Sequence, residues 1–384
     1  MEPEHPFDSF RSRVVTEEIG AALAMGRFDG SLEHATAPAL RIFAARILRD
    51  TITASLRQEG HEFTDDRYHA WFAGLATLND TQPRHTRPPR VVCEAILVEL
   101  SHCRWIPLAE AAIRIRPAFL APNDLEADEA HARVHKAIAD ARLLVERLRV
   151  KSFPQPFALL EALHEEVLRS VLFAPPQPGV FPMPPAIRRT PIEQQPDASP
   201  RWAIELAFAD CLQVAGWLRT ALPLIGLLRP DALRPTAAIA RADALREAME
   251  RLHKNLGEAT SLAQRSHLRA PGRRKTSRAP ELFELLAGFG PMRSAQMETV
   301  LGVTRLGIRG ILAALDGEGL IERRTIAGSH LYAVTPGRIG DRAASERLGE
   351  GAFSTDALDE FGSSMARLDD LLARHSAQTD GAEE

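Results

Sequence analysis

The sequence predicts a mainly α-helical protein with one small β-hairpin near its C-terminal end. Ala, Arg, Leu and Glu are plentiful, whereas Tyr occurs only twice in 384 residues, and this composition favours helices. Apolar residues recur at three- and four-residue spacing along most of the chain, and two short runs flank a Gly-containing turn after residue 320. We therefore expect a multi-helical N-terminal body, a middle region with a long helix, and a compact C-terminal module.

Residues 1–172 are predicted to form the N-terminal helical domain. The first helix carries an apolar stripe at Val15, Ile19 and Leu23, and the second runs from about residue 37 to residue 56. Further helices are expected from about residue 65, from 91 to 100, after a cap at Asn123, and from 157 to 173.

A proline-rich linker and an apolar helical region follow. Residues 173–200 contain nine of the 27 prolines and few periodic apolar residues, which is typical of an extended linker. In the region 201–264, the apolar stretch from 203 to 228 is interrupted by Glu205, Asp210 and Arg219, so we expect a buried helix pair and no membrane span. Residues 239–256 predict a long helix that packs along the preceding helices or along a second copy of the chain.

Basic residues are concentrated after residue 264. From 265 to 338 there are twelve Lys or Arg against six Asp or Glu, a net charge of +6, while the whole chain carries −4 and the remainder therefore −10. Six of the twelve lie in the predicted basic linker 265–279 or next to it, among them Arg273, Arg274 and Lys275. Such a segment could track a phosphate backbone or could be only a solvated linker.

Residues 280–337 show the pattern helix, helix, tight turn, helix, hairpin. Ser294 is expected to cap the second helix, Gly302 to end it, and Thr304 to cap the third. The third helix turns its apolar side inward, which leaves Arg305, Leu306 and Arg309 on its outer side. After a turn at residues 327–329, a two-stranded ribbon places Arg323 and Arg324 where they could meet phosphates.

This order of elements resembles the winged helix-turn-helix regulators over about 55 residues. The resemblance implies a third helix that enters a DNA major groove and a hairpin that contacts the DNA backbone. Glu298 departs from the pattern because a small residue is usual there, and Gly307 and Gly310 lie inside the recognition helix, where each costs ~1 kcal/mol relative to alanine. The alternative is a module with the same fold that docks only to protein.

Three further segments resemble a wider family. EIGAALAMGRFDG, SLRQEGHEFTDDRYHAWFAGL and GRRKTSR look like stretches of rhizobial and related alphaproteobacterial proteins that pair a helical domain, sometimes described as Fic-like, with a C-terminal helix-turn-helix. This resemblance implies a bacterial, cytoplasmic DNA-binding protein. Fic enzymes use a loop of the form HPFxxGNGR, whereas DSFRSR follows His5 and its two neighbours, without the glycines that hold phosphates.

No complete catalytic or metal site is predicted. His131 and His135 share one helical face, but a solvated polar face explains them better than a metal site. Three cysteines without metal-like spacing fit a reducing cytoplasm, and the tail, residues 338–384, contains an apolar alternation from Leu358 to Leu372 that predicts an amphipathic helix.

The sequence thus predicts a transcription regulator that binds double-stranded DNA in the cytoplasm, associated with the nucleoid. We expect a homodimer, no cofactor, no metal, no membrane partner and a helical body that dimerises or senses a small molecule or protein effector. The alternative is a Fic-like or other transferase or toxin-type enzyme in the helical body, with the C-terminal module for targeting or autoregulation.

Overall fold

The computed structural model describes residues 6–79, 87–122, 127–151, 153, 155–175, 198–234, 237–268 and 278–336. The chain divides into two units, Met1–Val334 and Thr335–Glu384, and the described helices and strands all belong to the first. The fold is mainly α-helical with one antiparallel hairpin, as the sequence predicts. The amphipathic helix expected in the tail lies outside the described residues.

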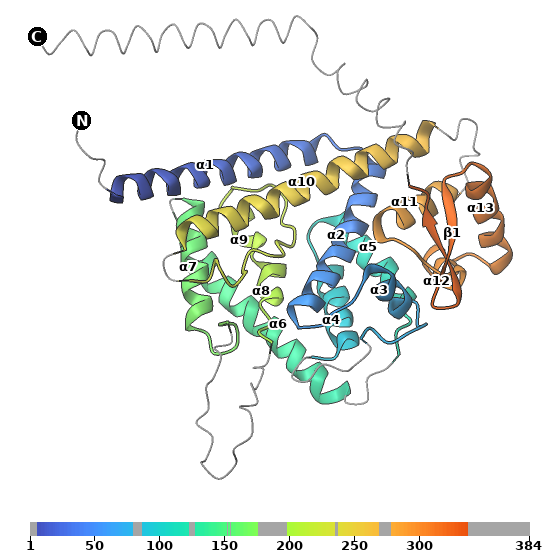
Figure 1. The fold of residues 1–384 in the computed structure, drawn as a ribbon, viewed down its shortest axis with the longest axis horizontal. Helices are drawn as coiled ribbons and strands as arrows, with labels where there is room; N and C mark the ends of the chain where they lie inside the picture. The colour runs from blue at the N-terminus through green and yellow to red at the C-terminus, as the bar shows by residue number, and fades with distance from the viewer. Residues whose placement is uncertain are drawn as a thin grey trace, which may run out of the picture. The chain divides into compact units, whose positions relative to one another are not determined.

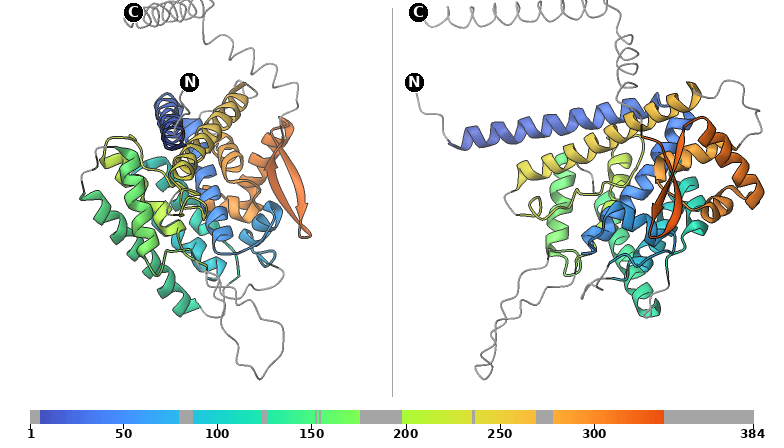
Figure 2. Two further views of the ribbon diagram at one scale, coloured as in Figure 1. Left: turned by 60° about the vertical axis from the view of Figure 1, so that its left-hand side comes forward. Right: turned by 45° about the vertical axis from the view of Figure 1, so that its right-hand side comes forward.

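Two long helices far apart in sequence lie side by side. They are α1 (Pro6–Glu33) and α10 (Ala238–Leu268), seen in blue and yellow in Figures 1 and 2. The long helix expected around 239–256 is present, but it packs along the N-terminal helix, which is neither of the two partners that the sequence indicated. The buried face of α1 is formed by Ala21, Ala24, Met25, Phe28 and Leu32.

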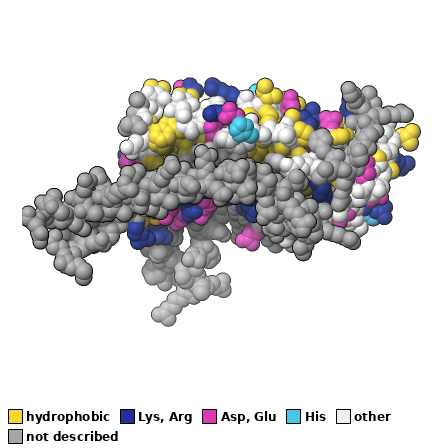
Figure 3. All heavy atoms as spheres, turned by 90° about the horizontal axis from the view of Figure 1, so that it is seen from above, with side chains coloured by type: hydrophobic (Ala, Val, Ile, Leu, Met, Phe, Trp, Pro, Cys, Tyr) yellow, Lys and Arg dark blue, Asp and Glu magenta, His cyan; other side chains and the backbone are white. Residues whose placement is uncertain are grey.

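The apolar stripe predicted on the first helix lies on the outside of the unit. Val15, Ile19 and Leu23 are 48%, 56% and 55% exposed. Helix α1 thus has two apolar faces, and the one with Ala24 and Phe28 packs against the body. Figure 3 views the molecule from the side of α1 and α10, where hydrophobic side chains reach the surface between charged ones.

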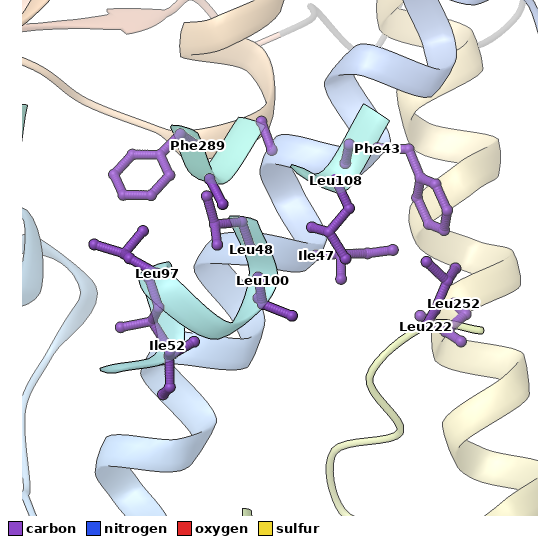
Figure 4. Close-up of a cluster of buried hydrophobic side chains, with 14 of the residues drawn as sticks. Phe43, Ile47, Leu48, Ile52, Leu97, Leu100, Leu108, Leu222, Leu252 and Phe289 are labelled. Atoms are coloured by element: carbon purple, nitrogen blue, oxygen red, sulfur yellow. The ribbon is translucent and has the colours of Figure 1, made fainter. Parts of the chain in front are cut away.

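Helix α2 (Ala37–Gln58) is the central element of the core. Its N-terminus is capped by the Thr36 hydroxyl, which accepts a hydrogen bond from the Ala39 N–H at 3.4 Å. It packs against α4 (Pro89–Ser101), α5 (Ile106–Ile115), α10 and α11 (Ala279–Phe289). Figure 4 shows side chains of α2 meeting those of these neighbours; the labelled residues are Phe43, Ile47, Leu48, Ile52, Leu97, Leu100, Leu108, Leu222, Leu252 and Phe289.

The N-terminal body contains further helices. They are α3 (Asp65–Phe72), α4 (Pro89–Ser101), α5 (Ile106–Ile115), the short 3₁₀ helix η1 (Arg116–Ala118), α6 (Ala127–Arg149) and α7 (Pro156–Arg169). Helices α3, α4, α6 and α7 agree with those expected from apolar spacing, although α7 ends four residues earlier than predicted, whereas α5 and η1 were not predicted. Asn123, the predicted cap of α6, lies outside the described residues.

The apolar stretch from 203 to 228 is buried but is only partly helical, which corrects the predicted helix pair. Helices α8 (Trp202–Ala207) and α9 (Ala209–Val214) are each six residues long. Beyond them the backbone turns at Gly216 and Gly226, which have positive φ, and Pro223 lacks the N–H that a helix interior requires. The result is a loop, residues 215–234, that packs its leucines into the core.

The C-terminal elements are α11 (Ala279–Phe289), α12 (Ser294–Leu301), α13 (Arg305–Gly317), β1 (Ile321–Ile326) and β2 (Ser329–Val334). We call these elements, residues 279–334, the C-terminal module. Its first helix shares the core of the body, because α11 packs closely along α2. At Gly288 a Cβ atom would stand 2.4 Å from the Ile42 carbonyl oxygen, so only glycine permits this approach.

Candidate nucleic-acid interface

Helices α12 and α13 are joined by a tight turn whose geometry follows from three residues. Gly302 ends α12 in the left-handed conformation, with φ 58° and ψ 38°. The Thr304 hydroxyl accepts a hydrogen bond from the Gly307 N–H at 3.3 Å and caps α13. The predicted cap at Ser294 is wrong by one residue, because Arg293 is the N-cap and its N–H donates to Gln296 Oε1 at 3.0 Å.

The outer face of α13 is open to solvent. Ile308, Leu312 and Leu315 are buried against the rest of the module, as the spacing predicts. Leu306 is 79% exposed, and Arg305 and Arg309 are exposed beside it. In Figure 1, α13 lies at the right-hand edge of the unit. The described residues therefore leave this face free for a partner.

Gly307 and Gly310 of α13 could each be replaced by a larger residue without a steric clash. A Cβ atom at Gly310 would meet nothing within 4 Å, and one at Gly307 would meet only Thr304 and Val303 at ordinary contact distances. No described residue of the preceding helix α12 comes close enough to require glycine at these positions. Because glycine has no side chain, another backbone could approach α13 closely at these positions.

The hairpin is tighter than the sequence predicts. Ile326 pairs directly with Ser329, so the loop is the two residues Ala327 and Gly328, and Ser329 belongs to the strand. Both loop residues have positive φ, 48° and 72°, which a two-residue loop of the type I′ kind requires. Among the described residues, only Met292 bridges to the other edge of β2, at Tyr332, with N···O distances of 2.9 and 3.1 Å.

The two arginines of the hairpin, Arg323 and Arg324, point to opposite faces. Arg323 stands opposite Tyr332, whereas Arg324 stands opposite the buried Leu331, and neighbours along a strand alternate between faces. Arg324 also bonds Glu322 Oε1 through Nε at 2.5 Å. The sequence placed both arginines at phosphates, but only Arg323 is both exposed and without a described partner.

Two arginines that precede α13 in sequence form hydrogen bonds within the protein. Arg278 Nη1 donates to the Leu301 carbonyl oxygen, and Arg293 Nη1 donates to the Ala73 carbonyl oxygen of the body at 3.1 Å. By contrast, Arg305 and Arg309 make no hydrogen bond or ion pair to any described residue. Arg273, Arg274 and Lys275 lie outside the described residues.

Polar contacts that no local pattern indicates hold the module on the body. Gln296 is buried, and its Nε2 donates to the carbonyl oxygens of Ala118 at 2.8 Å and Phe72 at 3.4 Å. Arg41 of α2 bonds both carboxylate oxygens of Glu284, at 2.6 and 2.9 Å. Ser294 is half-buried on the first turn of α12, beside these contacts. The module is thus fixed through α11 and the start of α12.

A buried histidine lies at this contact. His69 of α3 packs against Phe289, with ring centroids 6.2 Å apart, and a Cβ atom at Gly290 would stand 2.6 Å from its ring. Burial, with the nearby charges of Arg49 and Arg324, lowers the pKa of His69 to about 3, although Asp65 acts in the opposite direction. The neutral imidazole is therefore part of the docked state.

Two buried glutamates form a second polar cluster, inside the body. Glu59 accepts hydrogen bonds from Trp202 Nε1 at 2.6 Å and from Arg87 Nη1 at 2.9 Å. Glu205 Oε1 accepts from the N–H groups of Gly226 and Leu228, and burial raises its pKa to about 7. The sequence gives no sign of the buried role of Glu59, and for Glu205 the only signal is its place within an apolar run.

The histidines that the sequence offered as weak candidates for chemistry have ordinary surroundings or are not described. His131 bonds Glu94 at 3.3 Å, and no group of three or more His, Cys, Asp or Glu is placed to hold a metal ion within the described residues. His5 lies outside them, and Pro6 and the next residue open α1. No helix in the described part of the chain is long and apolar enough to cross a membrane.

No family model matches this chain, and a search of curated proteins finds no significant match. The function is therefore inferred from the arrangement of the C-terminal module.

Proposed function

We propose that the C-terminal module is a winged helix-turn-helix that binds double-stranded DNA and that the protein regulates transcription. The order α11, α12, turn, α13 and hairpin supports this, together with the short bridge from Met292 to Tyr332 that adds a third strand position. The observation that carries the proposal is the exposed outer face of α13, on which Arg305 and Arg309 have no described partner.

In the proposed complex, α13 enters the major groove. Arg305 and Arg309 meet base edges or phosphates, and Leu306 provides an apolar contact of the kind that thymine methyl groups accept. The open surface at Gly307 and Gly310 lets the helix backbone come near the duplex. Arg323 on the wing contacts a phosphate. The proposal assigns no phosphate contact to Ser294, because it is half-buried beside the body.

We further propose that the regulator acts as a homodimer, as its class often does on two half-sites. The supporting observation is the exposed stripe on α1, in which Val15, Ile19 and Leu23 are all about half exposed. No Lys, Arg, Asp or Glu lies between these residues on the same face of the helix. Sedimentation of the Ile19→Lys variant tests this, because a monomer is expected if the stripe pairs two chains.

Genome-wide footprinting of the tagged protein in the source cell tests the proposed function. We expect discrete occupied sites on the chromosome or on plasmids, in line with a nucleoid location, and their loss in the Arg305→Ala, Arg309→Ala double variant. Paired half-sites would also report the symmetry of the dimer. Recovery of the same DNA with wild type and double variant would contradict the proposal.

A further inference from the structure

A cavity lies in the body between α2, α10 and the loop 223–225. Its volume is about 200 Å³. The apolar part of its wall is formed by Ile47, Ala54, Leu224, Ala248 and Leu252, and the polar part by Asp50, Arg57, Arg251 and Asn255. A cavity of about 150 Å³ is enough to hold a benzene ring, so a small organic molecule fits here.

The guanidinium of Arg251 is fixed at this cavity by one hydrogen bond and has further N–H donors that are not used by described residues. Arg251 Nη2 donates to the Ile225 carbonyl oxygen at 3.1 Å. Its guanidinium lies against Gly226, where a Cβ atom would stand 3.2 Å from Nη2, and Gly226 has φ +90°. The Gly226 N–H is bonded by the buried Glu205. The remaining N–H groups of Arg251 bond no described residue.

The other charged groups of the cavity are already paired. Asp50 accepts hydrogen bonds from Arg49 at 2.7 Å and from Asn255 Nδ2 at 2.9 Å. Arg57 bonds Asp65 at 3.1 Å and stands over the Phe63 ring. Arg251 is therefore the group most able to bind an anion, while Asp50 would repel a second negative charge on the same molecule.

We propose that this cavity binds a small organic acid with a single carboxylate and an apolar body. The carboxylate pairs with Arg251, whose fork of N–H donors suits two carboxylate oxygens. The apolar body lies between Leu224 and Leu252. Because α2 and α10 both pack on α11, an acid bound here contacts the two helices that carry the C-terminal module. Binding of the acid does not depend on the proposed function; only an effect of the acid on DNA binding would rest on it.

Direct binding to the full-length chain tests the site without any DNA. The probes are benzoate and its uncharged analogue benzamide, measured by titration calorimetry and by the shift of the unfolding temperature. A probe of this size should bind wild type with a dissociation constant of about 1 mM. We expect benzamide to bind about tenfold more weakly, because it cannot form the charge-assisted pair.

Three variants locate the site. Arg251→Gln should weaken benzoate binding about tenfold. Lys254→Gln makes the same charge change one turn along α10, outside the cavity wall, and should bind benzoate as wild type does. Ala54→Leu should abolish binding by filling the cavity without changing the charge, so it tests the site even if Arg251→Gln does not fold. Equal binding of the two probes, no saturable binding to wild type, or retained binding in Ala54→Leu would overturn the proposal.

Discussion

The docked side and the outer side of the C-terminal module use the same residue types in opposite ways. On the docked side, Arg293 bonds the backbone carbonyl oxygen of Ala73, and Gly288 meets the carbonyl of Ile42. On the outer side, Arg309 has no described partner and Gly310 faces open space. Arginine and glycine content alone therefore does not distinguish a structural surface from a binding surface. The environment of each residue makes this distinction.

Replacement by alanine should change the stability most at Gly288, and in the opposite direction at Gly310. Gly288→Ala should lower the free energy of unfolding by about 3 kcal/mol, because the new methyl group collides with backbone. Gly310→Ala should raise it by up to about 1 kcal/mol, because alanine favours the helix and meets no atom. Urea unfolding of both variants measures the difference. Equal destabilisation would show that α13 is packed against something after all.

The arginines should show the same division at a smaller scale. Arg293→Ala should cost about 1–2 kcal/mol of stability, since it leaves the Ala73 carbonyl oxygen without its donor. Arg305→Ala should change stability by less than about 0.5 kcal/mol, as expected at an exposed site. Thermal unfolding at a fixed pH compares the two. A clear loss of stability in Arg305→Ala would mean that this side chain is structural.

The docked contact should also depend on pH through His69. Its pKa is lowered to about 3 in the folded protein from an ordinary 6.5, so the folded state resists taking up the proton. Its contribution to stability is present above pH 6.5 and is lost as the pH falls toward 3, at up to about 1.4 kcal/mol per pH unit. His69→Leu should therefore show a shallower acid decline in urea unfolding. Identical slopes would contradict the buried, neutral state.

Arg323 and Arg324 of the hairpin should differ slightly in their contribution to the salt dependence of DNA binding. Arg323→Ala should reduce the salt slope of DNA binding by about one unit, because one phosphate contact is lost. Arg324→Ala should reduce it less, because Arg324 is bonded to Glu322 on the other face of the hairpin. Fluorescence anisotropy with duplex DNA at several salt concentrations measures both. A larger effect at Arg324 would reverse the assignment of the faces.

Much of the helical architecture could be predicted from apolar spacing, and the failures have physical causes. The turn at Gly302 and the cap at Thr304 follow from local chemistry and are confirmed. The buried face of α1 could not be chosen, because small residues such as Ala24 pack as closely as Ile19 would, and the partner helix lies more than 200 residues away. Helix spacing gives periodicity but does not identify the neighbour.

The candidate site was predictable only in part for the same reason. Arg305 and Arg309 were placed on the outer face correctly, since that position depends on the helix alone. Opposite faces for Arg323 and Arg324 could have been expected from strand alternation. The residues that stand opposite them depend on register, which a loop one residue shorter than expected sets. The roles of Gln296, Arg293 and Glu205 depend on partners distant in sequence or on irregular loops, which no local pattern reveals.

The central claim is that the outer face of α13 binds the DNA backbone and groove through its arginines. The most direct test is the affinity of the purified protein for duplex DNA as a function of salt, for wild type and for the Arg305→Ala, Arg309→Ala double variant. We predict salt-dependent binding by wild type and a log–log slope smaller by up to about two units in the double variant, with unchanged stability. An unchanged slope and affinity, or no binding of duplex DNA at low salt, would contradict the claim.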